Sequence, residues 1–121
     1  MAQSELMLVF SNPAAGREDE YHRWYEEVHV PDVLRVPGVE SAQRHEISPV
    51  ETEEIEGAPN PPPPTHRFMV AYALSRSGQD VMQELSARVA SGEMPLSDVM
   101  DFATIEMSVW KPMGDPVVAH D

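Results

Sequence analysis

The spacing of apolar positions predicts a strand followed by a helix in the first third of the chain. Residues 5–11 are a short run of strand-forming side chains, and turn-forming residues follow it. Apolar side chains then recur three and four positions apart, as on one face of a helix. This stripe consists of Tyr21, Trp24, Tyr25, Val28 and His29. Because Pro31 cannot donate to the carbonyl of Glu27, we expect the helix to end or kink near His29 and a short turn to follow over residues 31–35.

Two further strands are predicted on either side of a segment that suits no regular element. Residues 39–47 alternate imperfectly and have no fully apolar face, which indicates an edge strand. Residues 66–74 are apolar on both faces, as a central strand would be. Residues 48–65 between them hold six prolines and four glutamates, and residues 61–64 should be extended polyproline. A connection of this length is usually a lid, an interface arm or a disordered segment.

The last third of the chain predicts a second helix and a fourth strand. Ser77 and Asp80 stand three residues apart, close to a capping box, and they precede a helical pattern that Gly92 ends. We expect a short helix near residues 96–102. A strand over residues 104–111 follows it.

The order of elements, β-α-β-β-α-β, predicts a single α+β domain over residues 1–112 with a flexible tail over residues 113–121. Right-handed crossovers place both helices on one face of a four-stranded antiparallel sheet, which is the ferredoxin-like arrangement. The other face still carries apolar side chains. Because an exposed apolar sheet is either an aggregation hazard or an interface, we expect a homodimer in which two sheets pack face to face as a dimeric α+β barrel.

The charge and composition of the chain limit the classes of partner and site that it can have. The formal net charge is −13, and such a surface repels nucleic acid and anionic membranes. No segment approaches the roughly 20 apolar residues of a membrane span, and no secretory signal is recognisable, so we expect a cytoplasmic protein. The sequence contains no cysteine, which excludes disulfides, thiolate metal sites and a cysteine nucleophile.

Residues 24–39, WYEEVHVPDVLRVPGV, together with Ala42 and Arg44, resemble the EthD-type proteins of the dimeric α+β barrel superfamily. The resemblance depends on an aromatic residue, a few acidic positions, a His-x-Pro and a Pro-Gly that leads into the second strand. It implies the barrel fold and a superfamily that includes muconolactone isomerases, cofactor-free monooxygenases, haem-degrading proteins and polyketide-tailoring enzymes. Fold alone does not choose among these activities. The proline-rich segment departs from the compact hairpin of those proteins.

His29 is the strongest candidate for chemistry. It lies on the inner face of the first helix, at the break that Pro31 imposes, where freed carbonyls make an apolar region locally polar. A neutral imidazole there could accept or deliver a proton near neutral pH. The alternative is a histidine that caps those carbonyls. Tyr25, one turn earlier, is the second candidate catalytic residue and would position the substrate through its hydroxyl.

Four more residues are candidates for substrate binding. Tyr21 and Trp24 would form an aromatic wall, although core packing is the simpler explanation for both. Arg44 could orient an anionic group or form a salt bridge at an interface. Phe68, in the central strand, completes the set. His22 and Glu26 lie beside His29 in the sequence but lack further ligands, so no metal site is predicted.

The leading hypothesis is a cofactor-free enzyme that acts on a small apolar carbonyl or aromatic compound. It would be an isomerase, a monooxygenase, or a tailoring enzyme for polyketides or aromatic catabolites, with His29 as general acid and base. The alternative is a non-catalytic ligand-binding or protein-interaction module built on the same dimer. Haem binding through His29 or His22 is a third possibility. The sequence shows no phosphate-binding loop, hydrolase elbow or nucleotide fingerprint.

Overall fold

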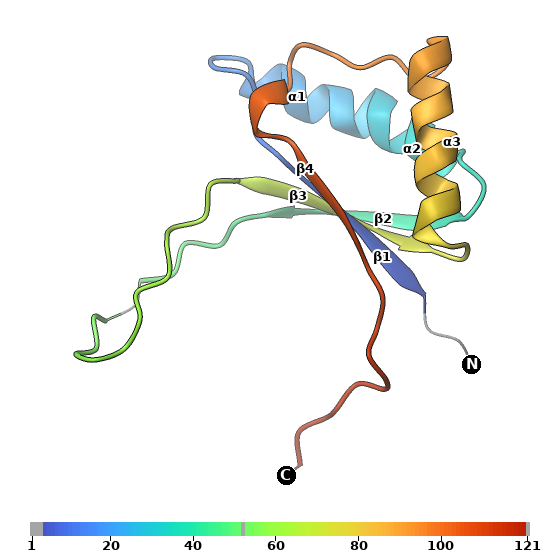
Figure 1. Ribbon diagram of the computed structural model, residues 1–121. Helices are drawn as coiled ribbons and strands as arrows, with labels where there is room; N and C mark the ends of the chain where they lie inside the picture. Colours follow the sequence, from blue (N-terminus) through green and yellow to red (C-terminus); the bar gives the residue numbers. More distant parts are fainter. Residues whose placement is uncertain (1–3, 52, 121) are drawn as a thin grey trace.

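Four antiparallel strands form one sheet in the computed structural model, which describes residues 4–51 and 53–120 (Figure 1). The sheet order is β2-β3-β1-β4, and every neighbouring pair is antiparallel. This order and the two covering helices confirm the ferredoxin-like α+β fold, with the second strand at an edge and the third inside. The strands are β1 (Glu5–Ser11), β2 (Val39–Glu46), β3 (Phe68–Leu74) and β4 (Glu106–Trp110).

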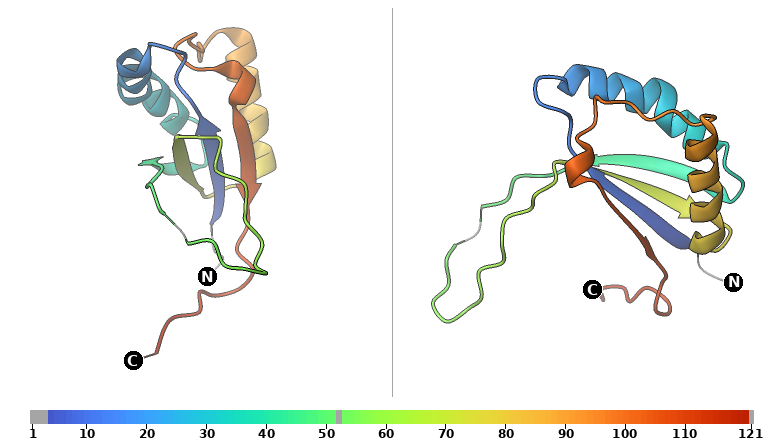
Figure 2. Two further views of the ribbon diagram at one scale, coloured as in Figure 1. Left: turned by 90° about the vertical axis from the view of Figure 1, so that its left-hand side faces the viewer. Right: turned by 45° about the horizontal axis from the view of Figure 1, so that its top comes forward.

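Two helical segments cover the same face of this sheet (Figures 1 and 2). The first runs without interruption through α1 (Glu18–Trp24), a π-helical turn η1 (Tyr25–His29) and α2 (Val30–Leu34). The second, α3 (Gly78–Ser91), begins after Ser77, whose Oγ accepts a hydrogen bond from the backbone N–H of Asp80 at 3.2 Å. It ends at Gly92, which adopts a φ of 84°. Both predicted ends of this helix are therefore confirmed.

Pro31 does not end the first helix, so the prediction of an end near His29 and a turn over residues 31–35 is wrong. The chain stays helical to Leu34, and the π turn immediately before the proline accommodates it. In this turn the N–H of Val30 donates to the carbonyl of Tyr25, five residues back. A π turn is wider than an α turn, which relieves the clash that a proline ring would otherwise make with the carbonyl four residues earlier.

The chain after α3 differs from the sequence prediction in one element. The short helix expected near residues 96–102 is absent from this described segment, and a single 3₁₀ turn η2 (Phe102–Thr104) comes later instead. Two contacts hold the segment in place: a bridge between Pro13 and Met100, and a hydrogen bond from the N–H of Ala14 to the carbonyl of Val99 at 2.7 Å. Long-range pairing with the β1–α1 turn thus replaces the local helix.

The core fills the space between the sheet and the helices. Alternate residues of the central strands point into it, and one of them, Ser11, is polar although only 1% exposed. Aromatic and aliphatic side chains from η1, α2 and α3 complete it. The strand and helix residues that form the centre of the core are Met7, Val9, Phe68, Val70, Tyr72, Leu74, Tyr21, Tyr25, Val33, Val81 and Leu85.

The opposite face of the sheet is not covered by a helix, and its middle is apolar, while the edge strands place Ser41, Gln43, His45, Glu106 and Ser108 on it. The register places Leu6, Leu8 and Phe10 of β1 on this face beside Met69 and Ala71 of β3. Trp110 of β4 pairs with Leu6 and is 60% exposed. The expected apolar face is therefore present, and no described helix is long and apolar enough to cross a membrane.

The proline-rich connection between β2 and β3 projects from the end of the sheet as an extended arm, residues 47–67 (Figure 2). Its described residues form no helix or strand, as predicted. Asn12 fixes its root: the side-chain amide donates to the carbonyl of Thr65 at 2.9 Å, and its oxygen accepts from the N–H of Arg67 at 2.8 Å. His66 adds a hydrogen bond to the carbonyl of Thr104 at 2.5 Å.

Gly78 provides the first test of the packing. A Cβ at this position would overlap the side chain of Val109 on β4. We expect Gly78→Ala to lower the free energy of unfolding by about 1–3 kcal/mol because the helix and strand cannot both keep their places. Urea denaturation measures the change. The matched control is Gln79→Ala, at the next, exposed position, and Val109→Ala should restore part of the loss. Equal stability of Gly78→Ala and the unaltered protein would contradict this packing.

Candidate functional site

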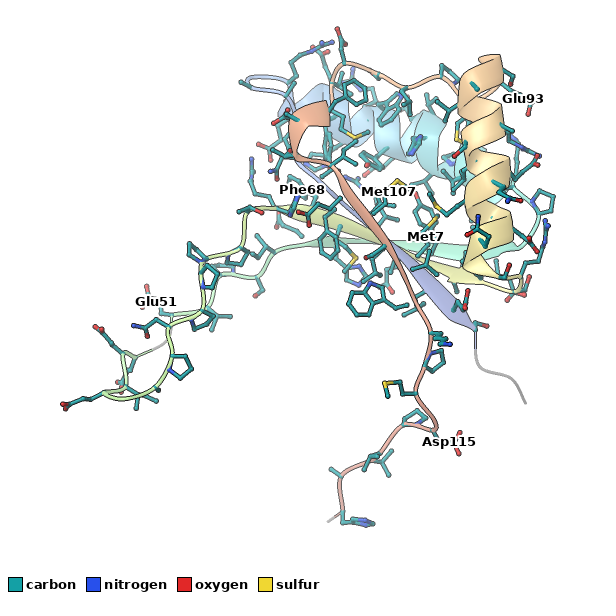
Figure 3. The ribbon with its side chains drawn as sticks, viewed as in Figure 1. Met7, Glu51, Phe68, Glu93, Met107 and Asp115 are labelled. Carbon is teal, nitrogen blue, oxygen red and sulfur yellow. The ribbon has the colours of Figure 1, made fainter. Side chains whose placement is uncertain are left out.

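A partly enclosed cavity of about 140 Å³ lies between the π turn, the sheet and α3. Its wall is almost entirely apolar and rich in methionine, and Met7 and Met107 contribute to it from β1 and β4 (Figure 3). A cavity of ~150 Å³ is large enough to hold one benzene ring. The lining residues are Met7, Val9, Tyr25, His29, Val33, Tyr72, Leu85, Val89, Met94, Leu96, Met100, Ile105 and Met107.

A larger groove of about 570 Å³ lies at the root of the arm, where Phe10, His45 and Met69 face Pro62–Pro64. It is more open than the cavity, and of its two histidines, His45 and His66, the second is already bonded to a backbone carbonyl. The smaller cavity is lined by His29, whose buried Nδ1 has no hydrogen-bond partner, and the described residues of the groove hold no such atom. We therefore take the smaller cavity as the candidate site.

His29 enters the cavity wall from the last position of the π turn. Its imidazole stacks on the indole of Trp24, with ring centroids 4.5 Å apart and an interplanar angle of 16°. The ring of Tyr25 meets it edge-on, with centroids 5.4 Å apart and an angle of 89°. Two aromatic rings thus hold the imidazole in one orientation, so its nitrogens have defined directions.

The Nδ1 atom of His29 is buried and has no hydrogen-bond partner among the described residues. The capping of helix carbonyls that the sequence left open as an alternative is therefore not made by this atom. Burial lowers the pKa of His29 to about 4, and the nearby carboxylate of Asp32 opposes this shift only in part. The ring is neutral at pH 7. An unpaired buried nitrogen costs about 1–3 kcal/mol, which a ligand could recover by supplying the missing partner.

Tyr25, like Tyr72, brings a hydroxyl-bearing side chain to the cavity wall. Its hydroxyl donates to the Sδ of Met100 at 4.0 Å and shares a hydrogen bond with the Oγ of Ser11 at 3.0 Å. The same Oγ lies 2.5 Å from the hydroxyl of Tyr21. Burial is the main reason that the pKa of Tyr25 is raised to about 12, so the phenol remains protonated and can act as a donor.

Ser11 is the residue of this site that the sequence interpretation missed. Its position two residues after Val9 and four after Met7 places it in the buried phase of β1. A serine in that phase must satisfy its hydroxyl inside the core, so it marks a buried hydrogen bond. That signal is present in the sequence, but the partners Tyr21 and Tyr25 become identifiable only when the helix is docked.

Arg44 faces the helices because β2 contains a bulge between Val39 and Ser41, after which its even-numbered residues point inward. Its guanidinium lies 5.0 Å above the ring of Tyr25 and 5.9 Å above that of Tyr21. It also donates to the Nδ1 of His22 at 2.7 Å. Since arginine only donates, this His22 nitrogen is an acceptor.

The structure brings two of the six predicted site residues, Tyr25 and His29, to the cavity. The other four surround it without lining it. Trp24 supports His29 by stacking, while Tyr21 and Phe68 pack against each other in the core with ring centroids 5.5 Å apart. Arg44 lies behind the tyrosines. Among the described residues, no group of three or more His, Asp or Glu side chains could hold a metal ion.

Comparison with known proteins finds solved structures of similar fold but no match in sequence. No family model and no curated protein matches the sequence. A candidate monooxygenase from Shewanella loihica PV-4 superposes with a TM-score of 0.57 at 15% identity, over 95% of this chain and 99% of that one. An EthD family protein from Bacillus halodurans C-125 gives a TM-score of 0.50 at 10% identity, over 92% of this chain and 99% of that one.

A third structure is the monooxygenase from the gene ActVA-Orf6 of Streptomyces coelicolor, in complex with the ligand nanaomycin D. It gives a TM-score of 0.52 at 14% identity, over 98% of this chain and 94% of that one. At these identities the likeness concerns the fold. The chain therefore has the EthD-like α+β fold that its sequence resembles.

The buried imidazole predicts a specific pH dependence of stability. Because the pKa of His29 is lowered to about 4 in the folded protein from 6.5, the unfolded chain takes up a proton between these values that the folded chain does not. This contribution is complete above about pH 6.5 and is lost as the pH falls towards 4. It amounts to about 3 kcal/mol at most.

We expect His29→Phe, which keeps a ring against Trp24, to lose less stability between pH 7 and pH 4.5 than the unaltered protein. Urea denaturation at several pH values in this range measures both proteins. If the free energy of unfolding falls with pH by the same amount in both proteins, His29 is not the group responsible.

Proposed function

We propose that the protein is a cofactor-free enzyme that binds a small, mostly apolar, single-ring compound in the His29 cavity and uses His29 as general base and acid. The observation that carries this proposal is a neutral imidazole in the wall of an apolar cavity, whose buried Nδ1 has no hydrogen-bond partner among the described residues. A cavity of about 140 Å³ suits a ligand of one ring, and methionine-rich walls suit an apolar one.

The proposed chemistry begins with proton transfer to His29. A neutral imidazole accepts a proton from a phenolic hydroxyl or from a carbon next to a carbonyl. Burial disfavours the imidazolium that forms, so the proton is readily returned to the substrate at the same or another atom. Return of the proton to another atom is an isomerisation. Reaction of the substrate anion with O₂ is a monooxygenation, in which one oxygen atom enters the substrate and the other leaves as water with two hydrogens and their electrons taken from the substrate. The monooxygenases among the structural neighbours favour the second outcome.

We also propose that two copies pair through the open face of the sheet. The middle of this face is a continuous apolar surface, and such surfaces mark interaction sites. Leu6 and Trp110 are 43% and 60% exposed on this face. Pairing would remove them from water and leave the His29 cavity, on the other side of the sheet, within each copy.

A non-catalytic interaction module is the second candidate function, and the arm favours it. The arm carries exposed apolar residues, among them Val50 at 76% and Ile55 at 66% exposure. The groove of about 570 Å³ at its root could take part of a protein partner. In this alternative the cavity is only a gap in the core, and His29 has no role in turnover.

The test of catalysis is a panel of single-ring phenols and hydroxycarbonyl compounds, followed by product analysis and oxygen uptake. We expect His29→Phe to reduce turnover about 10²- to 10⁴-fold, the usual contribution of a general acid or base. Val28→Ala, at an exposed position of the same π turn, is the matched control and should retain the rate. Binding without turnover, or equal rates in His29→Phe and the unaltered protein, would favour the interaction module.

Leu8→Glu tests the pairing of sheets. Leu8 lies in the middle of the open face, between Ala71 and Ser108. A carboxylate there would be buried at the interface, so we expect the variant to sediment as a monomer while its circular dichroism stays unchanged. Ala87→Glu, at an exposed position of α3, is the control and should remain paired. A Leu8→Glu protein that still sediments as a dimer would place the interface elsewhere.

A further inference from the structure

We propose that the proline-rich arm of one copy binds the C-terminal tail of a second copy, and that the groove at the root of the arm is the binding site for that tail. The arm is residues 47–67, and the tail is residues 111–120, which follow β4. This inference rests on the pairing of sheets proposed above and names the segments that meet at its edges.

The arm and the tail both extend on the side of the sheet that faces away from the helices (Figures 1 and 2). They leave the sheet at opposite ends of β1. The arm joins β3 beside Ser11, because Ser11 pairs with Phe68, whereas the tail follows Trp110, which pairs with Leu6. A second copy seated on the open face of the sheet therefore lies between an arm and a tail.

The groove is a continuation of the open face. Phe10 and Met69 line it and belong to the apolar middle of this face, and His45 adds the neighbouring edge strand. Ile47 and Pro62–Pro64 form the other wall, and the groove has a volume of about 570 Å³. A copy that covers the middle of the face consequently reaches the groove as well.

The tail supplies apolar side chains that its own chain leaves in water. Met113 is 101% exposed, Val117 is 99% exposed and Val118 is 71% exposed. Their transfer from water into an apolar groove is favourable. The described tail forms no helix or strand, so it can lie along the groove as an extended segment.

Symmetry leaves two limiting arrangements. Two identical sheets that pack face to face are related by a two-fold axis in the plane between them. If this axis crosses the strands, the strands of the two copies run in opposite directions, and the tail of each copy lies at the arm end of the other. If the axis follows the strands, the two arms lie together at one end and the two tails at the other.

Charge favours the first arrangement. The arm carries four glutamates between residues 51 and 56, and residues 47–66 contain no lysine or arginine. Two such arms side by side would repel each other. The tail begins with Lys111, the single lysine of the sequence, so a tail beside an arm brings opposite charges together.

Disulfide trapping tests the contact, because the chain has no cysteine of its own. Ile47→Cys places a thiol in the groove, and Val117→Cys places one in the tail. The two singly substituted proteins are refolded together and oxidised, and a non-reducing gel with mass spectrometry identifies the covalent dimer. We expect a dimer that contains one chain of each kind. Since each chain has one thiol, this link forms only between copies.

Ala90→Cys, at an exposed position of α3, is the matched control for Val117→Cys. The helices lie on the other side of the sheet, so this thiol should link to Ile47→Cys only at the rate of random collisions. Rapid links between two Ile47→Cys chains, or between two Val117→Cys chains, would show that like segments meet at the same end and would overturn the inference.

A second readout is the strength of pairing in the full chain. Val117→Ser combined with Val118→Ser should raise the dissociation constant of the dimer at least about 10-fold, the effect of leaving one valine side chain in water. Sedimentation at several concentrations measures it. Ala119→Ser, the next position of the tail, is the control and should pair like the unaltered protein. An equal dissociation constant for all three proteins would contradict burial of the tail.

The outcomes separate this inference from the proposed function. If Leu8→Glu separates the copies but Ile47→Cys and Val117→Cys do not link, the pairing of sheets stands and the role of the arm is overturned. If the unaltered protein sediments as a monomer, the pairing and this inference fail together. The assay of turnover in His29→Phe then decides separately whether the cavity is catalytic.

Discussion

The missing N–H of Pro31 is the constraint on which the rest of the site depends. A proline inside a helix must lose one hydrogen bond and displace a carbonyl, and here the chain absorbs both in a single π turn. The turn contains one more residue than an α turn would, so it changes the side chains that face the sheet from that point onwards. His29 and Val33 consequently line the cavity, whereas Val28 is 38% exposed. A substitution of Pro31 that let the π turn close to an α turn would therefore move the imidazole of His29 as well as the backbone.

The position of the helical segment also depends on polar contacts with the sheet. Ser11 of β1 hydrogen-bonds to two tyrosines of the helical segment, and Arg44 of β2 lies over the rings of the same two tyrosines. The bulge in β2 brings Arg44 to this side of the sheet. The orientation of the helix on the sheet is thus set by polar contacts within an otherwise apolar core. Such contacts are directional, which apolar packing is not.

The parts of the fold that depend on a few neighbouring residues were predictable from the sequence. The helix cap at Ser77 and the end at Gly92 depend on a few neighbouring residues, and both were predictable from them. The central strand was recognisable because both of its faces are apolar. The π turn was not, because sequence shows that a proline disturbs a helix but not whether the helix ends or widens. A short helix was expected near residues 96–102, but this segment forms long-range contacts with the β1–α1 turn instead.

The sequence likewise predicted only part of the candidate site. Spacing placed Tyr25 and His29 on one face, and both line the cavity. Tyr21, Trp24, Arg44 and Phe68 were within reach of that face, but the depth of each side chain depends on how the helix is rotated and where the strand bulges. Ser11 was overlooked because a serine near the end of a strand is most often a turn residue, and its burial follows from the docked helix.

The methionines of the cavity wall have a further consequence for how such a protein can change during evolution. Met7, Met94, Met100 and Met107 come from separate parts of the chain and meet around one small space. Each has three rotatable bonds and no branch, so the shape of the space can change without movement of the backbone. His29 and Tyr25, in contrast, are held by contacts between aromatic rings and by the hydrogen bond between Ser11 and Tyr25. Ligands of different shape could therefore be accommodated by adjusting the flexible wall while His29 and Tyr25 keep their orientation.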